Sequence, residues 1–206
     1  MIRVIDRHNR DQFAETLEGQ FRFRHEIFVK ERGWTDFDRD GCYEVDQYDN
    51  DHTIYFAAID DDERVTGCFR LYPSTLPHML SEHFRHLIDG DVPARLDVYE
   101  MTRISVARTQ RGGTTYHELL AGLQEYCLDE SIVGATALIR LHRLAAVQMA
   151  GFDVKPLGLP QQVGDEQLLA VMFGINHASL SRVLQVAKLT GPVLERNIGR
   201  PERQIA

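Results

Sequence analysis

Residues 97–113 read DVYEMTRISVARTQRGG and predict a β-strand that ends in a glycine turn. Within this stretch, residues 97–106 alternate loosely between apolar and polar side chains, as a partly buried strand does. A helical pattern over residues 116–130 follows the turn directly. A strand, a glycine turn and the start of a helix, in this order, can hold an anion on free backbone N–H groups. Paired glycines before a helix also serve tight turn geometry alone, so both interpretations stay open.

Two charged residues, Glu100 and Arg103, interrupt the predicted strand. A charged strand residue either faces water or is held in a site, because an unpaired buried charge is too costly to keep. Residues three apart in a regular strand point to opposite faces, so a salt bridge between these two residues would need a bulge. The stretch alone is compatible with an exposed edge and with a functional site.

The composition is that of an ordinary soluble globular protein. A chain of 206 residues, 43% hydrophobic and 26% charged, predicts a single domain over residues 1–206 with a frayed tail from about residue 197. The formal net charge of −8 argues against general nucleic-acid binding, which needs a basic surface. No apolar run approaches the ~20 residues of a membrane span, and the start MIRVIDRHNR lacks the apolar segment of a signal peptide. We therefore expect a cytoplasmic protein without membrane insertion.

The three cysteines, Cys42, Cys68 and Cys127, are widely spaced along the chain. They follow no metal-ligand pattern and are too few for a disulfide framework. We expect no metal site.

Hydrophobic periodicity predicts a mixed α/β order of elements. Strands are expected at 1–6, 53–59, 64–71, 97–106, 132–139 and 152–157. Helices are expected at 10–18, with Gly19 ending this first one, and at 20–31, 76–88, 116–130, 141–150 and 167–188. Residues 33–52 hold the only Trp and a dense set of carboxylates, and they predict a long ordered loop, which is more often functional than not. One central sheet flanked by helices is the simplest packing of these elements.

Eight charged and aromatic residues occur in a recognisable order between residues 20 and 103. They are Arg24 and Phe28 in FRFRHEIFVKERGW, Trp34, Asp46 and Asp49 in EVDQYD, Arg70 in FRLYPSTLP, and Glu100 and Arg103 in YEMTR. The set resembles the invariant residues of the acyl-homoserine-lactone synthases, the autoinducer synthases of bacterial quorum sensing. The resemblance extends from about residue 20 to the PLGLP segment at 156–160. Tyr99, Thr102 and Ile104 depart from the pattern of that family and could reshape the acyl pocket.

The resemblance implies a GNAT-like acyltransferase fold, which is an α-β-α sandwich with a central mixed β-sheet flanked by helices. It also implies a reaction between S-adenosylmethionine and an acyl thioester, either acyl-CoA or acyl-carrier protein, with no cofactor beyond these substrates. The amine of S-adenosylmethionine attacks the thioester carbonyl. The methionyl carboxylate then closes on its own γ-carbon, and methylthioadenosine leaves.

The charges of S-adenosylmethionine suggest a role for most of the matched residues. Arg24 and Arg103 could hold its carboxylate, because a guanidinium fork matches a carboxylate bidentately. Asp46 and Asp49 could hold the ammonium. Phe28 and Trp34 would supply stacking and cation–π surface for the sulfonium end.

Glu100 is the predicted general base that removes the ammonium proton, with Asp46 and Arg103 as further catalytic residues. Arg70 is expected either to contact the substrate or to anchor the acidic loop to the sheet. Thr102 and Ser105 complete the predicted substrate-binding strand. Arg108 and Arg111 flank the glycine turn, where CoA pyrophosphate or a carrier's pantetheine arm could lie.

Two other functions stay open on the sequence. An ordinary GNAT-type N-acyltransferase would use acyl-CoA on another amine, and it would not need the aromatic and acidic loop 33–49. A catalytically silent module that senses CoA or S-adenosylmethionine would not need both Glu100 and Arg103. The sequence does not specify the acyl group, although the front half looks most similar to family members that take short branched or aryl groups from CoA.

Overall fold

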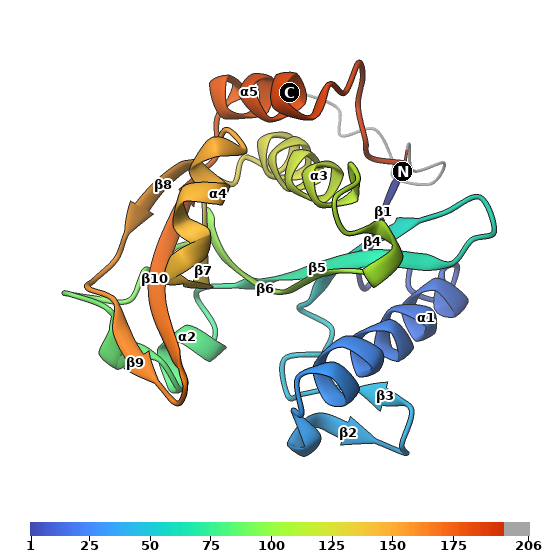
Figure 1. Cartoon of the computed structure of the whole chain (residues 1–206), viewed down its shortest axis with the longest axis horizontal. Coiled ribbons are helices and arrows are strands. Elements are labelled where there is room, and N and C mark those ends of the chain that lie inside the picture. Colours follow the sequence, from blue (N-terminus) through green and yellow to red (C-terminus); the bar gives the residue numbers. More distant parts are fainter. Residues whose placement is uncertain (196–206) are drawn as a thin grey trace.

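The computed structural model describes residues 1–195, which are built around one eight-stranded sheet (Figure 1). The strand order is β1-β4-β5-β6-β7-β10-β8, and β9 pairs with β10 off this path. The strands are β1 (Ile2–Ile5), β4 (Ile54–Ile59), β5 (Val65–Pro73), β6 (Val98–Val106), β7 (Gly134–Arg140), β8 (Asp153–Pro156), β9 (Gln161–Val163) and β10 (Glu166–Gly174). β6 and β7 are parallel, and the other neighbours in this sheet pair antiparallel. The predicted mixed sheet is confirmed.

Helices cover both faces of the sheet. The longer ones are α1 (Ala14–Arg24), which continues into the π-helix η1 (His25–Glu31), α3 (Thr115–Asp129) and α5 (His177–Ala187). The short ones are η2 (Thr35–Phe37), α2 (Met79–Glu82), η3 (Arg85–Leu87), η4 (Arg108–Gln110), η5 (Leu141–Arg143) and α4 (Leu144–Met149). In Figure 1, α3 lies over one face with α5 stacked on it, and α1 lies under the opposite face. The α-β-α arrangement is therefore confirmed.

The main core lies between α3 and the sheet. α3 is amphipathic, and its apolar side places Leu119 and Leu123, both fully buried, against Phe56 and Phe69 of the central strands. A second, smaller apolar cluster forms under α2 and η3, where Leu80 and Leu87 pack near β10. No helix among residues 1–195 is both long and apolar enough to cross a membrane.

Two irregularities in β6 shape the centre of the sheet. The parallel pairing of β6 with β7 ends at the partners Glu100 and Thr136, although both strands run on, so the strands separate from that point. On its other side, β6 carries a bulge: Cys68 of β5 faces Ser105, but Arg70, only two residues on, faces Thr102. A bulge of this kind turns an extra side chain toward one face of the sheet.

The predicted break at Gly19 is wrong. One continuous helical segment runs from Ala14 to Glu31, with Gly19 inside it, and residues 10–13 form turns before it. At His25 the segment widens into a π-helix, a rare form that occurs frequently at functional sites.

Two of the other predicted helices are wrong in type or length. Residues 167–188 hold a strand, β10, followed by α5, which begins after the N-cap Asn176. The run Leu168–Phe173 is apolar without a clear period, and such a run cannot be assigned to strand or helix by periodicity alone. Residues 76–88 form only the short pieces α2 and η3. The loop 33–52 is largely irregular as expected, but it includes the short hairpin of β2 (Asp38–Arg39) and β3 (Tyr43–Glu44). The tail predicted from residue 197 lies outside the described residues.

Candidate active site

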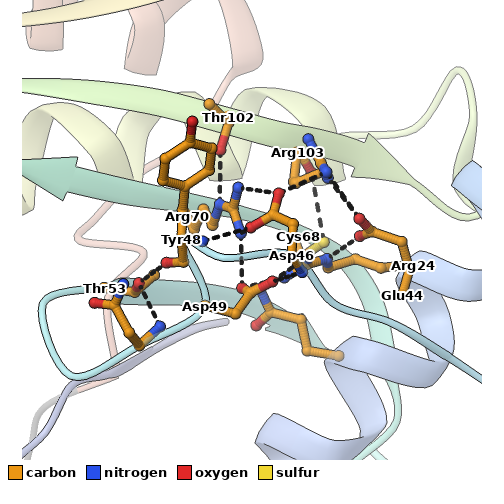
Figure 2. A network of polar contacts seen from close by, with 12 residues as sticks. Arg24, Glu44, Asp46, Tyr48, Asp49, Thr53, Cys68, Arg70, Thr102 and Arg103 are labelled. Carbon is orange, nitrogen blue, oxygen red and sulfur yellow. Dashed lines mark hydrogen bonds and ion pairs between the residues drawn. The ribbon is translucent and has the colours of Figure 1, made fainter. Parts of the chain in front are cut away.

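Three arginines and three carboxylates form a closed network of ion pairs under the central strands (Figure 2). The arginines come from three separate elements, α1, β5 and β6, and the carboxylates come from β3 and the loop after it. The members are Arg24, Arg70, Arg103, Glu44, Asp46 and Asp49. The formal charges cancel, so this buried set needs no outside partner for neutrality.

Arg24 and Arg70 anchor the acidic loop to the fold. Arg24 donates from Nη1 and Nη2 to the two oxygens of Asp49, at 2.7 and 2.8 Å, and from Nε to Glu44 at 2.6 Å. Arg70 donates to both oxygens of Asp46 at 2.7 Å each, and from Nε to the Thr102 hydroxyl at 2.8 Å. Both guanidinium groups have their donors committed to the protein. Arg24 and Arg70 are completely buried, at 0% exposure.

Arg103 differs because one edge of its guanidinium remains uncommitted. Its Nε and Nη2 donate to Glu44 Oε1 at 3.0 and 2.8 Å, and Nη2 also donates to Asp46 Oδ2 at 2.7 Å. Its Nη1 makes no hydrogen bond with any residue in the described part of the chain, although the Arg103 side chain is only 4% exposed. Arg103 is thus the arginine of the network that can receive an external carboxylate.

The bulge in β6 places Arg103 on this face. Arg103 has a φ of +59°, which a non-glycine residue adopts only when its surroundings require it. Arg103 and its neighbour Thr102 both bond to the network, which a regular alternation would not allow. The Ser105 hydroxyl lies below it and donates to the Arg103 carbonyl at 3.3 Å.

Two carboxylates of the acidic loop accept hydrogen bonds from the backbone of the same loop. Asp46 Oδ1 accepts the backbone N–H of Tyr48 at 2.9 Å, and Asp49 Oδ2 accepts the backbone N–H of Asp46 at 2.9 Å. The first of these contacts is an Asx turn, in which the side chain accepts the N–H two residues on. Burial alone would raise the pKa of Asp49, but Arg24 and Arg70 outweigh it and hold that pKa well below its usual range.

Three aromatic rings surround the Arg103 guanidinium. Its carbon lies 5.5 Å from the ring centre of Phe28, 5.1 Å from that of Trp34 and 5.1 Å from that of Phe37. Phe28 and Trp34 stack at 5.0 Å, and Trp34 remains 37% exposed. The rings form an aromatic wall that begins at η1 and opens to solvent at Trp34. This is the kind of surface that a sulfonium or an adenine ring requires.

Glu100 lies beside this network but does not pair with Arg103. Its Oε1 accepts the backbone N–H of Leu80 at 2.7 Å, and its Oε2 accepts that of Met79 at 3.1 Å, both in the first turn of α2. Burial raises the pKa of Glu100 from its ordinary value to about 7, although the two N–H groups and Arg70 lower it. The bulge that could have restored a salt bridge with Arg103 is present, yet Glu100 is taken by α2.

Arg108 and Arg111, the predicted donor-binding arginines, lie at the glycine turn but away from the network. Both pair with Glu31, the last residue of η1. The turn beside them leads into α3, whose N-terminus has no side-chain cap within the described residues. An uncapped helix N-terminus favours an anion.

Glu44 was not among the predicted site residues. It is fully buried and joins Arg24 to Arg103, so it connects α1 with β6. Its place in EVDQYD, two residues before Asp46, is the signal that could have identified it. Phe37 was also missed, because nothing in the sequence shows that η2 turns its ring toward Arg103.

Comparison with known proteins identifies relatives over most of the chain. The model of the family described as autoinducer synthase matches residues 8–183. The isovaleryl-homoserine lactone synthase of Bradyrhizobium diazoefficiens is 40% identical over 182 residues, which cover 87% of this chain and 82% of that protein.

Solved structures resemble this fold closely. The CoA-dependent acyl-homoserine lactone synthase BjaI, solved with SAM and isopentyl-CoA, has a TM-score of 0.89 and 36% identity, over 95% of this chain and 92% of that one. A Lactobacillus plantarum structure described as an N-acetyltransferase has a TM-score of 0.58 at 16% identity, over 85% of this chain and 99% of that one. This second likeness concerns the fold alone, and it supports the expected GNAT-like architecture.

Proposed function

The chain belongs to the autoinducer synthase family, and we propose from this premise that it makes an acyl-homoserine lactone from S-adenosylmethionine and an acyl-CoA. The observation that carries the proposal is the open edge of Arg103 inside the aromatic wall of Phe28, Trp34 and Phe37. A cation with an unused donor beside aromatic surface suits a substrate that joins a carboxylate to a sulfonium and an adenine.

The acceptor would bind with its carboxylate on Arg103 Nη1 and its sulfonium end along Trp34. Asp46, which already accepts from Arg103 and Arg70, supplies the negative charge that favours the ammonium. In this proposal Arg24 and Asp49 act as positioning residues, because their side chains are 0% and 1% exposed and bond to each other. Arg70 likewise anchors Asp46, and so holds the acidic loop to the sheet and does not contact the substrate.

Glu100 is the proposed general base. At pH 7, about a tenth of an ordinary α-amine is unprotonated, so freeing the amine costs about 1.4 kcal/mol. A carboxylate with a pKa of about 7 is well matched to that proton. The two α2 N–H groups fix the carboxylate and still leave lone pairs for the ammonium or for a bridging water.

The acyl donor would enter where β6 and β7 separate. From that gap, the pantetheine arm can run toward the glycine turn and place the CoA phosphates near α3, Arg108 and Arg111. The comparisons favour a short branched acyl group, because the curated relative is named for isovaleryl and the solved structure contains isopentyl-CoA.

The ordinary N-acyltransferase is the weaker candidate. It would not require the six-membered ion-pair network that holds the loop 33–49 in place, nor the aromatic wall on it. The family membership and the position of Arg103 both favour the lactone synthase.

No cofactor is required for the proposed chemistry, because both leaving groups belong to the substrates. We also propose a cytoplasmic location, since three free cysteines, Cys42, Cys68 and Cys127, suit a reducing compartment.

The decisive experiment incubates the purified protein with S-adenosylmethionine and a panel of acyl-CoA and acyl-carrier donors. Methylthioadenosine release and the lactone product are followed by chromatography and mass spectrometry. We expect release with short branched acyl-CoA donors. An absence of methylthioadenosine with every donor would contradict the proposed function, whereas release with carrier donors alone would overturn only the choice of CoA.

A further inference from the structure

Glu31 joins the helix of the aromatic wall to the turn proposed for the donor phosphates. Its Oε1 accepts from Arg108 Nε at 2.7 Å, and its Oε2 accepts from Arg111 Nη2 at 2.9 Å. One carboxylate therefore serves two guanidinium groups, one in η4 and one directly after it. Glu31 is the last residue of η1, the element that also carries Phe28 of the aromatic wall. Its ion pairs with Arg108 and Arg111 therefore connect the two proposed substrate sites.

The glycine turn leaves open space beside the two arginines. Gly112 has a φ of +92°, which glycine adopts without strain, and an added Cβ there would meet no atom within 4 Å. The Thr114 hydroxyl, placed to cap α3, instead donates to Glu118 at 2.6 Å. The anionic group that this chain itself presents to both arginines is the Glu31 carboxylate, and the arginines lower the pKa of Glu31 against the opposing effect of burial.

These ion pairs are exchangeable. The side chains of Arg108 and Arg111 are 70% and 50% exposed, and pairs this exposed to water contribute little to stability. A multiply charged phosphate can bind each of two such guanidinium groups bidentately. A single carboxylate shared between them binds each one more weakly.

Neighbouring charges leave the region positive even with Glu31 present. Arg32 lies 4.8 Å above the Phe28 ring and is subject to the charges of Arg111 and Arg140. Arg140 pairs with Glu166. Four arginines thus face two carboxylates, and losing Glu31 as a partner would leave the turn more strongly cationic.

We propose that Glu31 is the built-in counter-anion of the donor-phosphate site: it offsets part of the positive charge of Arg108 and Arg111 in the free enzyme and is displaced when the phosphates of acyl-CoA bind. This inference rests on the proposed use of acyl-CoA. Glu31 therefore weakens donor binding and makes the donor site discriminate for a multiply charged phosphate over a simple monoanion.

The test is a calorimetric titration of free coenzyme A onto the purified wild-type protein, Glu31→Gln and Glu26→Gln. Glu26 is the matched control, since it lies on the same helix and pairs at 2.6 Å with Lys30, away from the turn. We expect the Kd for coenzyme A to fall about 2–10-fold in Glu31→Gln, the range that two exposed ion pairs allow, and to stay unchanged in Glu26→Gln. A Glu31→Gln protein that binds coenzyme A no more tightly than the wild type would overturn the proposal.

A second variant checks the displacement itself. Arg111→Gln should weaken coenzyme A binding more in the Glu31→Gln background than in the wild type, because Arg111 is not neutralised there. Equal effects in the two backgrounds would show that Glu31 and the ligand do not compete for Arg111.

The readout separates this inference from the proposed function. Tighter coenzyme A binding by Glu31→Gln supports the counter-anion even if no methylthioadenosine is released with any donor. If the wild type releases methylthioadenosine but neither protein binds coenzyme A, the lactone synthesis stands and the counter-anion proposal is overturned.

Discussion

Glu100 Oε1 accepts the backbone N–H of Leu80 at 2.7 Å, so the proposed base is held by the first turn of α2 and not by the nearby arginine, Arg103. The carboxylate is fixed by neutral donors, and burial keeps its pKa near 7. Had it paired with a guanidinium, its pKa would have fallen and its basicity with it. The contact with α2 is therefore what makes Glu100 a suitable base at neutral pH.

Replacing Glu100 by Gln should lower kcat by about 10²–10⁴-fold, because the amide cannot accept the ammonium proton. The Kd for S-adenosylmethionine should stay close to that of the wild type. Steady-state methylthioadenosine release measures kcat, and calorimetric titration measures the Kd for S-adenosylmethionine. Equal turnover would mean that Asp46 or water is the base, and Glu100→Asp tests whether a displaced carboxylate retains part of the activity.

The free energy of unfolding should depend on pH through the ionisation of Glu100. The pKa of Glu100 is about 7 in the folded protein against an ordinary value of 4.5, so between these pH values the folded state holds a proton that the unfolded state has lost. The wild type should therefore lose stability relative to Glu100→Gln as pH rises from 4.5 to 7, by about 3 kcal/mol. Urea unfolding of both proteins at pH 5 and pH 8 measures this difference, and parallel curves would contradict it.

Replacing Glu44 by Gln should destabilise the protein by about 3–5 kcal/mol, because Arg24 and Arg103 would each lose a buried anionic partner. Thermal unfolding followed by circular dichroism measures the loss. Glu26→Gln is again the control, since the Glu26–Lys30 pair is 58% exposed on both sides and should cost at most about 1 kcal/mol. Similar losses in the two variants would mean that the network contributes no more than a surface pair.

Replacing Trp34 by Ala should raise the KM for S-adenosylmethionine by about 2–30-fold, the range of a cation–π contact of about 0.5–2 kcal/mol. Trp34 is 37% exposed, so the fold should tolerate the change. Trp34→Phe should keep much of the affinity, because it keeps an aromatic face. The prediction fails if Ala and Phe give the same KM, or if only the KM for the acyl donor rises.

Elements with strong local signals were predicted from the sequence. The amphipathic stripe of α3 and the hairpin of β4 and β5 could be identified because their periodicity and turn residues lie within one segment. The helix predicted over 167–188 was wrong because the run in β10 is apolar on both faces. Only its neighbours β7, β8 and β9 decide that it is a strand.

Functional residues were predictable where a charged side chain occurs in an otherwise apolar segment, or where charges are concentrated in a long loop. Glu100 and Arg103 were identified as unusual from the strand alone, and the acidic loop from its length and composition. Their partners were not predictable, since Glu44 meets Arg103 from 59 residues away and Glu100 meets α2 from 20 residues away.

The sequence by itself therefore determined which residues carry charge, aromatic surface and helical periodicity. The tertiary structure decided which of them meet. A bulge in β6 turned Arg103 onto the face that holds the acidic loop, and the separation of β6 from β7 opened the sheet beside it. Both are properties of strand pairing, whose hydrogen bonds join segments distant in sequence, and local patterns do not record them.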